Sequence, residues 1–306
     1  MPGLYSEEFS VGQRLDHEGS QAMNAASLLF VPASRPERYL KAQQSGAGAL
    51  ILDLEDSVAP GAKEEARRNL AAMLAAQPAH QQVWVRVNPA ESGLLLADLA
   101  AVVPGRPFGI VLPKCCGRAS LEPVCHQLDA LEVAFGVPPG STKILAIATE
   151  TGASMFHLGE LVGVTERLWG ITWGGEDLAA DLGALANREG GLFTEPYRIA
   201  RALCLYAAAA AGVRAVDTVS VAINAPDAVR AESLDAKRDG FVAKMAIHPS
   251  QLAPINEAFA YSAEERAWAE RVIAAFAEQP GAGALQLDGQ MIDMPHLRLA
   301  RRMLGQ

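Results

Sequence analysis

The sequence predicts an α/β protein, a (β/α)8 TIM barrel with a C-terminal helical lid or oligomerisation arm. Three observations support this prediction. Eight short apolar runs recur along the chain, segments with helical periodicity lie between them, and polar residues follow the runs. Eight strand–helix units filling about 220 residues approach the ~250 residues that such a barrel typically needs. A doubly wound open sheet shows the same alternation and is the alternative.

The predicted strands are short, and each ends close to a Gly, Pro, Asp or other polar residue. In chain order they cover residues 28–32, 49–53, 83–88, 109–113, 144–149, 168–172, 215–221 and 241–247. Helical periodicity is clearest over residues 35–45, 62–76, 120–135 and 197–211, the last of which is rich in alanine.

Three segments are expected. Residues 1–26 are polar and acidic at their start and predict a mobile leader rather than a signal peptide. Residues 27–262 hold the barrel. Residues 263–306 form the lid or arm, with helices over 263–277 and 297–304 and a break at Pro280 and Gly281.

Composition excludes several classes of protein. Of the 306 residues, 50% are hydrophobic and 20% are charged, which suits a large folded core. The net charge of −9 disfavours nucleic-acid binding. The longest apolar run is about half of the ~20 residues that span a membrane. Four cysteines without a Cys-x-x-Cys pair predict reduced thiols and a cytoplasmic protein.

Polar side chains follow most of the predicted strands. Because the carboxyl ends of the strands meet at one mouth of a barrel, these side chains are expected to converge. They are Asp53, Glu55, Asp56, Arg86, Asn88, Lys114, Glu150, Glu176, Asp177 and His248.

Glu150 and Asp177 are the predicted metal ligands. Mg²⁺ commonly uses one or two carboxylates together with water and substrate, and Mn²⁺ accepts the same oxygen ligands. The alternative is that both acids are merely solvated or salt-bridged. His248 ends the last strand before Pro249, and neither it nor His157 has a predicted partner.

Arg86 has a planar guanidinium group that suits a substrate carboxylate, although it could instead pair with Asp53 or Glu55. The acids Asp53 and Glu55 could supply a general base or only orient Arg86. Lys114 is open to two similar interpretations, a ligand contact or a structural ion pair. Gly174 and Gly175 would allow a ligand to approach the backbone closely.

Seven motifs in order resemble the citrate lyase beta-subunit-like branch of the HpcH/HpaI aldolase family, from about residue 27 to 304. The most specific are Leu52-Asp53-Leu54-Glu55-Asp56-Ser57-Val58 with Lys63 and Arg67, and Trp173-Gly174-Gly175-Glu176-Asp177. The others are Leu29-Phe30-Val31-Pro32, Val85-Arg86-Val87-Asn88, Leu112-Pro113-Lys114, Thr149-Glu150-Thr151 and Ala246-Ile247-His248-Pro249.

The resemblance implies Mg²⁺ on Glu150 and Asp177 rather than Glu176, with Arg86 holding the substrate. It implies cleavage or formation of a 3-hydroxy-acyl-CoA such as citryl-CoA or malyl-CoA, with acyl-CoA and 2-oxo acids as ligands. It also implies a homo-oligomer, a trimer or hexamer, in which Asp293 of the lid acts near the acyl-CoA α-carbon of a neighbouring subunit. Alternatives are an aldolase acting on free 2-oxo acids, a thioesterase side activity, and a subunit active only within a lyase complex.

Three residues depart from the family pattern, in which Arg precedes the first signature and Gly occupies two later positions. They are Ala26, Ala33 and Ala243. We expect Ala26 to weaken a contact with a CoA phosphate or a substrate carboxylate.

Overall fold

The structure is a computed structural model that describes residues 26–78 and 81–306. It contains two compact units, and the second is Ala260–Gln306. The first ends at Phe259, three residues before the predicted end of the barrel. The predicted leader, residues 1–26, lies outside the described residues except for Ala26.

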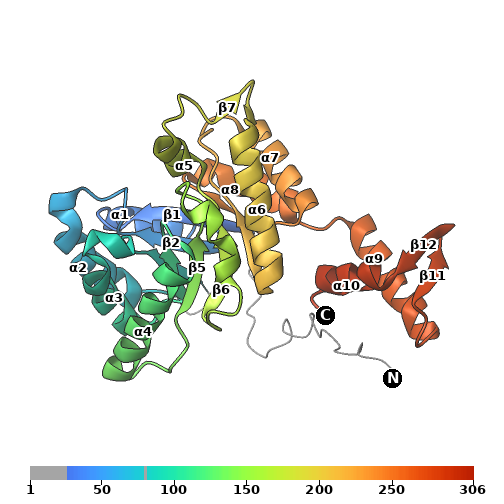
Figure 1. Cartoon of the computed structure of the whole chain (residues 1–306), viewed down its shortest axis with the longest axis horizontal. Coiled ribbons are helices and arrows are strands. Elements are labelled where there is room, and N and C mark those ends of the chain that lie inside the picture. Colours follow the sequence, from blue (N-terminus) through green and yellow to red (C-terminus); the bar gives the residue numbers. More distant parts are fainter. Residues whose placement is uncertain (1–25, 79–80) are drawn as a thin grey trace, which may run out of the picture. The chain divides into compact units, whose positions relative to one another are not determined.

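The first unit is a closed barrel of eight parallel strands in the order β1-β10-β9-β6-β5-β4-β3-β2. Figure 1 shows strands of this barrel among the helices α1 to α8. Because β1 pairs with both β2 and β10, the sheet closes on itself. The predicted (β/α)8 barrel is confirmed, and the open-sheet alternative is wrong. The strands are β1 (Ser27–Pro32), β2 (Ala49–Asp53), β3 (Gln82–Arg86), β4 (Gly109–Leu112), β5 (Lys143–Ile147), β6 (Leu168–Thr172), β9 (Arg214–Asp217) and β10 (Ala243–Ala246).

Within the described residues, eight α-helices accompany the barrel strands. They are α1 (Pro36–Ala42), α2 (Lys63–Ala75), α3 (Leu95–Val102), α4 (Gly117–Phe135), α5 (Gly175–Leu182), α6 (Glu195–Ala211), α7 (Pro226–Asp239) and α8 (Leu252–Phe259). The regular alternation fails at one connection. Two 3-10 turns, Ser154–Phe156 and Leu158–Leu161, join β5 to β6, whereas α5, a hairpin (β7, Arg188–Glu189; β8, Leu192–Phe193) and α6 all lie between β6 and β9. None of these helices is both long and apolar enough to cross a membrane, a finding that covers only the described residues.

Alternate residues of each strand point to opposite faces of the sheet, as the two-residue period of a strand requires. One face packs inside the barrel and the other packs against the helices. In β1, Leu28 packs inside the barrel, whereas Leu29 packs between the strands and the helices. Near the strands' N-terminal ends, Trp84 contacts the rings of Phe108 and Trp169 at centroid distances of 4.9 and 5.0 Å. Large side chains therefore fill that end of the barrel, and space for a ligand is left at the carboxyl ends.

The second unit consists of α9 (Ala263–Glu278), a hairpin of β11 (Ala284–Leu287) and β12 (Gln290–Asp293), and α10 (Met294–Leu304). Its own core includes Val272, Phe276, Ile292 and Leu297. The sequence predicted the two helices but not the hairpin. Asp288 and Gly289 both have positive φ, 51° and 79°, as the favoured two-residue hairpin turn requires.

Candidate functional site

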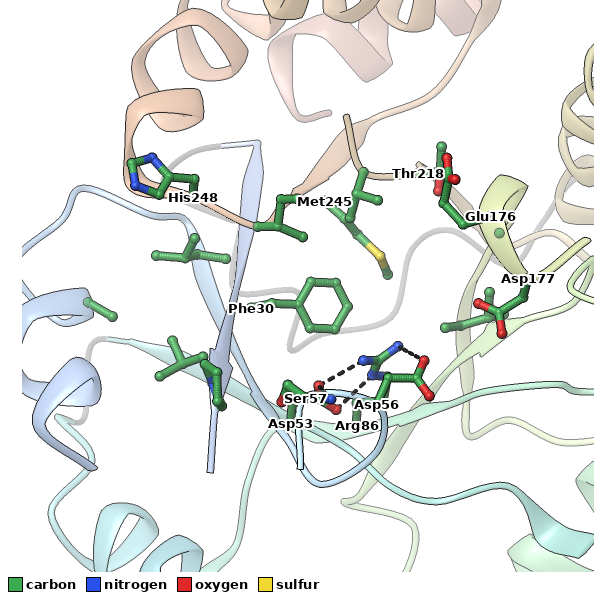
Figure 2. Close-up of a pocket in the computed structure, with 18 of the residues that line it drawn as sticks. Phe30, Asp53, Asp56, Ser57, Arg86, Glu176, Asp177, Thr218, Met245 and His248 are labelled. Carbon is green, nitrogen blue, oxygen red and sulfur yellow. Dashed lines mark hydrogen bonds and ion pairs between the residues drawn. The ribbon is translucent and has the colours of Figure 1, made fainter. Parts of the chain in front are cut away.

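A cavity of about 720 Å³ opens at the carboxyl ends of the barrel strands (Figure 2). Asp53, Arg86, Glu150, Gly174, Gly175 and Asp177 line it, so six of the predicted site residues share one space. Glu55 and Lys114 contact residues of this set from beside the cavity. The convergence follows from the topology, because parallel strands deliver the residues after their last pairs to one rim.

Arg86 ends β3 and is held by acids at the end of β2 and in the loop directly after it. Its Nε and Nη2 donate to the two carboxylate oxygens of Asp53 at 2.8 and 2.7 Å, and its Nη1 lies 3.0 Å from Glu55 Oε2. Burial raises the pKa of Asp53, but Arg86 and further hydrogen bonds outweigh it and hold that pKa below its usual value. Asp53 is therefore an ionised residue that orients Arg86, and N–H groups of the guanidinium remain for a ligand.

Lys114, directly after β4 and Pro113, joins three acids. Its Nζ lies 2.8 Å from Glu55 Oε1 and 3.1 Å from Asp177 Oδ1, and its backbone N–H donates to Glu150 Oε2 at 2.5 Å. Those carboxylates raise the pKa of the Lys114 ammonium against the opposing effect of its burial. The expected ion pair of Lys114 is present in the structure, while a substrate contact stays a prediction.

Glu150 follows β5 and is only 3% exposed, whereas Asp177 lies in the first turn of α5. Burial, reinforced by the negative charge of Asp177, raises the pKa of Glu150 to about 8. Gly174 packs directly against Glu150: a Cβ atom at position 174 would lie 2.6 Å from Glu150 Cγ. The glycine thus leaves the space that the Glu150 side chain occupies.

Glu176 and Asp177 are adjacent, but they point differently (Figure 2). Glu176 Oε1 accepts a hydrogen bond from Asn187 Nδ2 at 2.7 Å, on the side of the β7–β8 hairpin. Asp177 instead faces Lys114. This geometry supports Asp177, rather than its neighbour, as the partner of Glu150.

The donor set suits Mg²⁺ better than a transition metal. No group of three or more His, Cys, Asp or Glu side chains arranged to hold a metal occurs among the described residues. Two carboxylates with access to a cavity match an ion that completes its shell with water and substrate. Burial and the nearby charge of Asp177 raise the pKa of Glu150 and so disfavour its ionised form, which a divalent cation would favour.

A second set of polar residues, for which the sequence predicted no role, holds the loop after β2. Lys63 Nζ donates to the carbonyls of Leu54 and Glu55 at 2.6 and 2.7 Å and to Asn88 Oδ1 at 2.8 Å. Asn88 in turn donates to buried Asp98, which pairs with Arg67 at 2.7 Å. The four-residue spacing of Lys63 and Arg67, which places both on one face of a helix, was the available signal.

The cavity also extends away from the acids, past Phe30 and Met245 towards His248 (Figure 2). Arg38 and Lys41 of α1 also line the cavity. Both side chains are exposed, and neither forms an ion pair within the described part of the chain. Their three-residue spacing, which places two positive charges on one face of a helix, was the signal in the sequence that could have identified them as a pair.

Of the remaining predicted residues, His248 lines the cavity, whereas His157 and Asp293 do not. His248 caps a short turn and forms a 2.8 Å contact with Ser250 Oγ, and His157 pairs with Glu160, also at 2.8 Å. Asp293 caps α10 in the second unit and contacts His296 Nδ1 at 2.6 Å, so its role stays a prediction.

Ala26 precedes β1, and its carbonyl accepts a hydrogen bond from the Lys244 backbone at 2.9 Å. It lies at the N-terminal end of the strand and does not line the cavity, whose β1 residues begin at Leu29. The structure therefore gives the expected effect of Ala26 on ligand contacts no support, because the start and the end of a barrel strand lie at opposite mouths. That effect stays a prediction.

Comparison with known proteins indicates the same family as the sequence motifs do. The family model "HpcH/HpaI aldolase/citrate lyase" matches residues 26–249. The chain is 35% identical over 287 residues to a citrate lyase subunit beta-like protein of Deinococcus radiodurans, covering 91% of this chain and 96% of that one. It is 31% identical over 299 residues to the mitochondrial citramalyl-CoA lyase of Rattus norvegicus, and the match covers 91% of this chain and 84% of that one.

A further relative is a (3S)-malyl-CoA thioesterase of Cereibacter sphaeroides, 35% identical over 292 residues that cover 93% of this chain and 95% of that one. Among solved structures, CitE of Mycobacterium tuberculosis in complex with magnesium, acetoacetate and coenzyme A matches with a TM-score of 0.76. It is 32% identical, and the match covers 93% of this chain and 98% of that one. The prediction of a carbon–carbon lyase is confirmed, and the chain belongs to the HpcH/HpaI aldolase/citrate lyase family.

Proposed function

We propose that this protein is a Mg²⁺-dependent lyase that cleaves or forms a 3-hydroxy-acyl-CoA, giving an acetyl-CoA-type thioester and a 2-oxo acid. One observation carries the proposal. Glu150, Asp177 and Arg86 line the same cavity, so an anionic substrate could meet an ion and a guanidinium together. Magnesium in structures of a related protein supports the choice of ion.

The reaction breaks the bond between the thioester α-carbon and the carbon that carries the hydroxyl group. The hydroxyl loses its proton and becomes a carbonyl, while the bonding electrons pass to the thioester enolate, which then gains a proton. Bound Mg²⁺ would supply Lewis-acid stabilisation of negative charge on the oxygen atoms of the oxo acid.

The chain's own residues would orient the substrate and stabilise the same charge. Arg86, fixed by Asp53 and Glu55, would direct its remaining N–H groups at the carboxylate or developing oxyanion of the oxo acid. Gly174 and Gly175 would let that fragment approach the backbone. Asp293, from a neighbouring subunit of a trimer or hexamer, is the proposed proton carrier at the thioester α-carbon.

The extension of the cavity favours a CoA ester over a free 2-oxo acid. A volume of about 720 Å³ exceeds the needs of a three- or four-carbon acid and falls in the range for larger ligands. Arg38 and Lys41 offer two positive charges at its rim, where the phosphates of CoA could bind. An aldolase acting on free 2-oxo acids would leave this extension without a role.

The test is a cleavage assay on the purified chain with citryl-CoA, malyl-CoA and citramalyl-CoA, compared with the corresponding free hydroxy acids. We expect release of a 2-oxo acid and a CoA thioester, lost on chelation and restored by Mg²⁺ or Mn²⁺. Release of free CoA without a 2-oxo acid would indicate a thioesterase instead. Turnover that needs added partner subunits would indicate a component of a lyase complex, and full activity in a chelator would refute the metal pair.

A further inference from the structure

Lys114 contacts the proposed metal ligands in two different ways. Its backbone N–H donates to Glu150, and its side chain pairs with Asp177 at 3.1 Å. Among the described residues, Lys114 is the cation that pairs with Asp177. The same ammonium group also contacts Glu55 at 2.8 Å, so it lies between two carboxylates.

The backbone of Lys114 is held in a conformation that few residues adopt. Its φ of 50° lies in the left-handed region, which disfavours residues with a Cβ atom. This conformation turns the N–H of Lys114 towards Glu150 while the side chain reaches Asp177. A glycine would adopt the same backbone more easily, but it would provide no ammonium group.

At the mouth formed by the carboxyl ends of the barrel strands, the acidic side chains outnumber the cationic ones that pair with them. Asp53, Glu55 and Asp56 pair with Arg86, which leaves Glu150 and Asp177 to Lys114. Two neighbouring carboxylates repel each other unless a positive charge lies beside them. Lys114 supplies that charge, and it does so where a divalent ion would also bind.

We propose that Lys114 is a resident counter-ion: it holds Asp177 in the ion-free protein, releases it when a divalent cation binds, and keeps its contact with Glu55. The inference rests on the proposed metal pair. Its physical reason is competition. An ammonium group and a divalent cation attract the same carboxylate and repel each other, so Lys114 must weaken divalent-cation binding while keeping the empty site ordered.

Calorimetric titration of the full chain with MgCl₂ tests this proposal, using the wild type, Lys114→Met and Lys143→Met. Methionine keeps most of the length of the side chain and removes its charge. Lys143, at the start of β5 and thus at the other end of the barrel, is the matched control. We expect Lys114→Met to bind Mg²⁺ at least about fivefold more tightly than wild type, and Lys143→Met to bind it unchanged.

Unchanged or weaker binding by folded Lys114→Met would overturn the proposal while leaving the metal pair intact. Mg²⁺ binding by none of the three proteins would refute both the metal pair and the counter-ion role. Lys114→Gln provides a second neutral variant if the methionine variant does not fold. Crystals of the wild type soaked in MgCl₂ add a direct measurement, because Lys114 Nζ must then lie beyond 4.0 Å from Asp177, and retention of the 3.1 Å pair would contradict the exchange.

Discussion

Gly174 lies so close to Glu150 that any side chain at position 174 would displace the carboxylate. A Cβ atom there would come within 2.6 Å of Glu150 Cγ, shorter than real Cβ contacts. The backbone at Gly174 has φ of −126° and ψ of 107°, which any residue adopts without strain. The need for glycine therefore comes from the proposed metal ligand and not from the chain's own conformation.

Gly174→Ala should consequently impair the site more than the fold. We expect Mg²⁺ affinity and kcat/KM to fall about 10- to 100-fold, the usual effect of disturbing the support of a metal ligand. Gly159→Ala is the control, because a Cβ atom there meets nothing within 4 Å. Calorimetry and steady-state kinetics measure both variants, and equal Mg²⁺ affinities would show that Glu150 tolerates displacement.

Asp177 and Glu176 provide a matched test of the ligand assignment. Asp177→Asn removes a charge that faces Lys114 and Glu150, so we expect at least a ~100-fold loss of Mg²⁺-dependent turnover. Glu176→Gln keeps a group that can contact Asn187, and its turnover should change less than about threefold. The opposite ranking would transfer the ligand role to Glu176.

The proton on Glu150 should make metal binding depend on pH. Its pKa is raised to about 8, and a metal needs the ionised carboxylate. Mg²⁺ affinity should therefore rise about tenfold per pH unit up to about pH 8 and level off above it. Titrations between pH 6 and 9 measure this slope, and Glu150→Gln should remove both the slope and most of the affinity.

The same shift has a consequence for the stability of the ion-free protein. Between pH 4.5 and about 8 the folded state holds a proton on Glu150 that the unfolded chain has lost. This contribution to stability is complete below pH 4.5 and disappears as pH rises through about 8. The difference in Tm between wild type and Glu150→Gln, measured in a chelator, should therefore depend on pH, with wild type losing stability relative to the variant as pH rises.

Lys63 should matter for catalysis although it lies outside the cavity lining. Its three hydrogen bonds to Leu54, Glu55 and Asn88 hold the loop that positions Arg86. Lys63→Met should lower kcat/KM about 10- to 100-fold, and Lys63→Arg should restore little, since a planar guanidinium cannot reproduce that arrangement. Arg68→Met, at another position of the same helix, should behave as wild type, and steady-state kinetics of the three variants measure the difference.

A buried ion pair far from the carboxyl ends should govern acid stability. Glu132 accepts from Arg167 Nη1 and Nη2 at 2.8 and 2.5 Å. Burial raises its pKa, but the hydrogen bonds from Arg167 and Thr142 outweigh this and lower it to about 2. Its stabilisation is therefore complete above pH 4.5 and is lost as pH falls towards about 2.

Glu132→Gln should cost about 3 kcal/mol of unfolding free energy at pH 7, because it leaves the buried Arg167 with only the exposed Asp129 as a counter-charge. Glu122→Gln, on the same helix, removes an exposed pair with Arg118 and should cost less than about 1 kcal/mol. Urea unfolding at pH 7 and pH 3 measures both variants. The penalty for Glu132→Gln should shrink at pH 3, and a constant penalty would contradict the ion-pair explanation.

The sequence by itself predicted eight strand–helix units and, because polar residues follow most of the apolar runs, a site at the rim to which parallel strands bring them. The closure of the sheet, which excludes the open-sheet alternative, came only from the pairing of β1 with β10 in the structure. The sequence also placed Arg86, Glu150 and Asp177 at the same mouth. The positions of the strands and of the polar residues that follow them are enough for these two predictions. Both can be identified from short stretches of sequence.

Tertiary structure alone decided which polar group meets which. Lys114 pairs with Asp177, and Lys63 reaches Asn88, only because separate strands and helices close around one axis. It also showed that Ala26 lies away from the cavity and that Gly174 makes room for Glu150. Contacts between residues far apart in the chain depend on the register and side-chain direction of the folded barrel, which no local pattern in the sequence encodes.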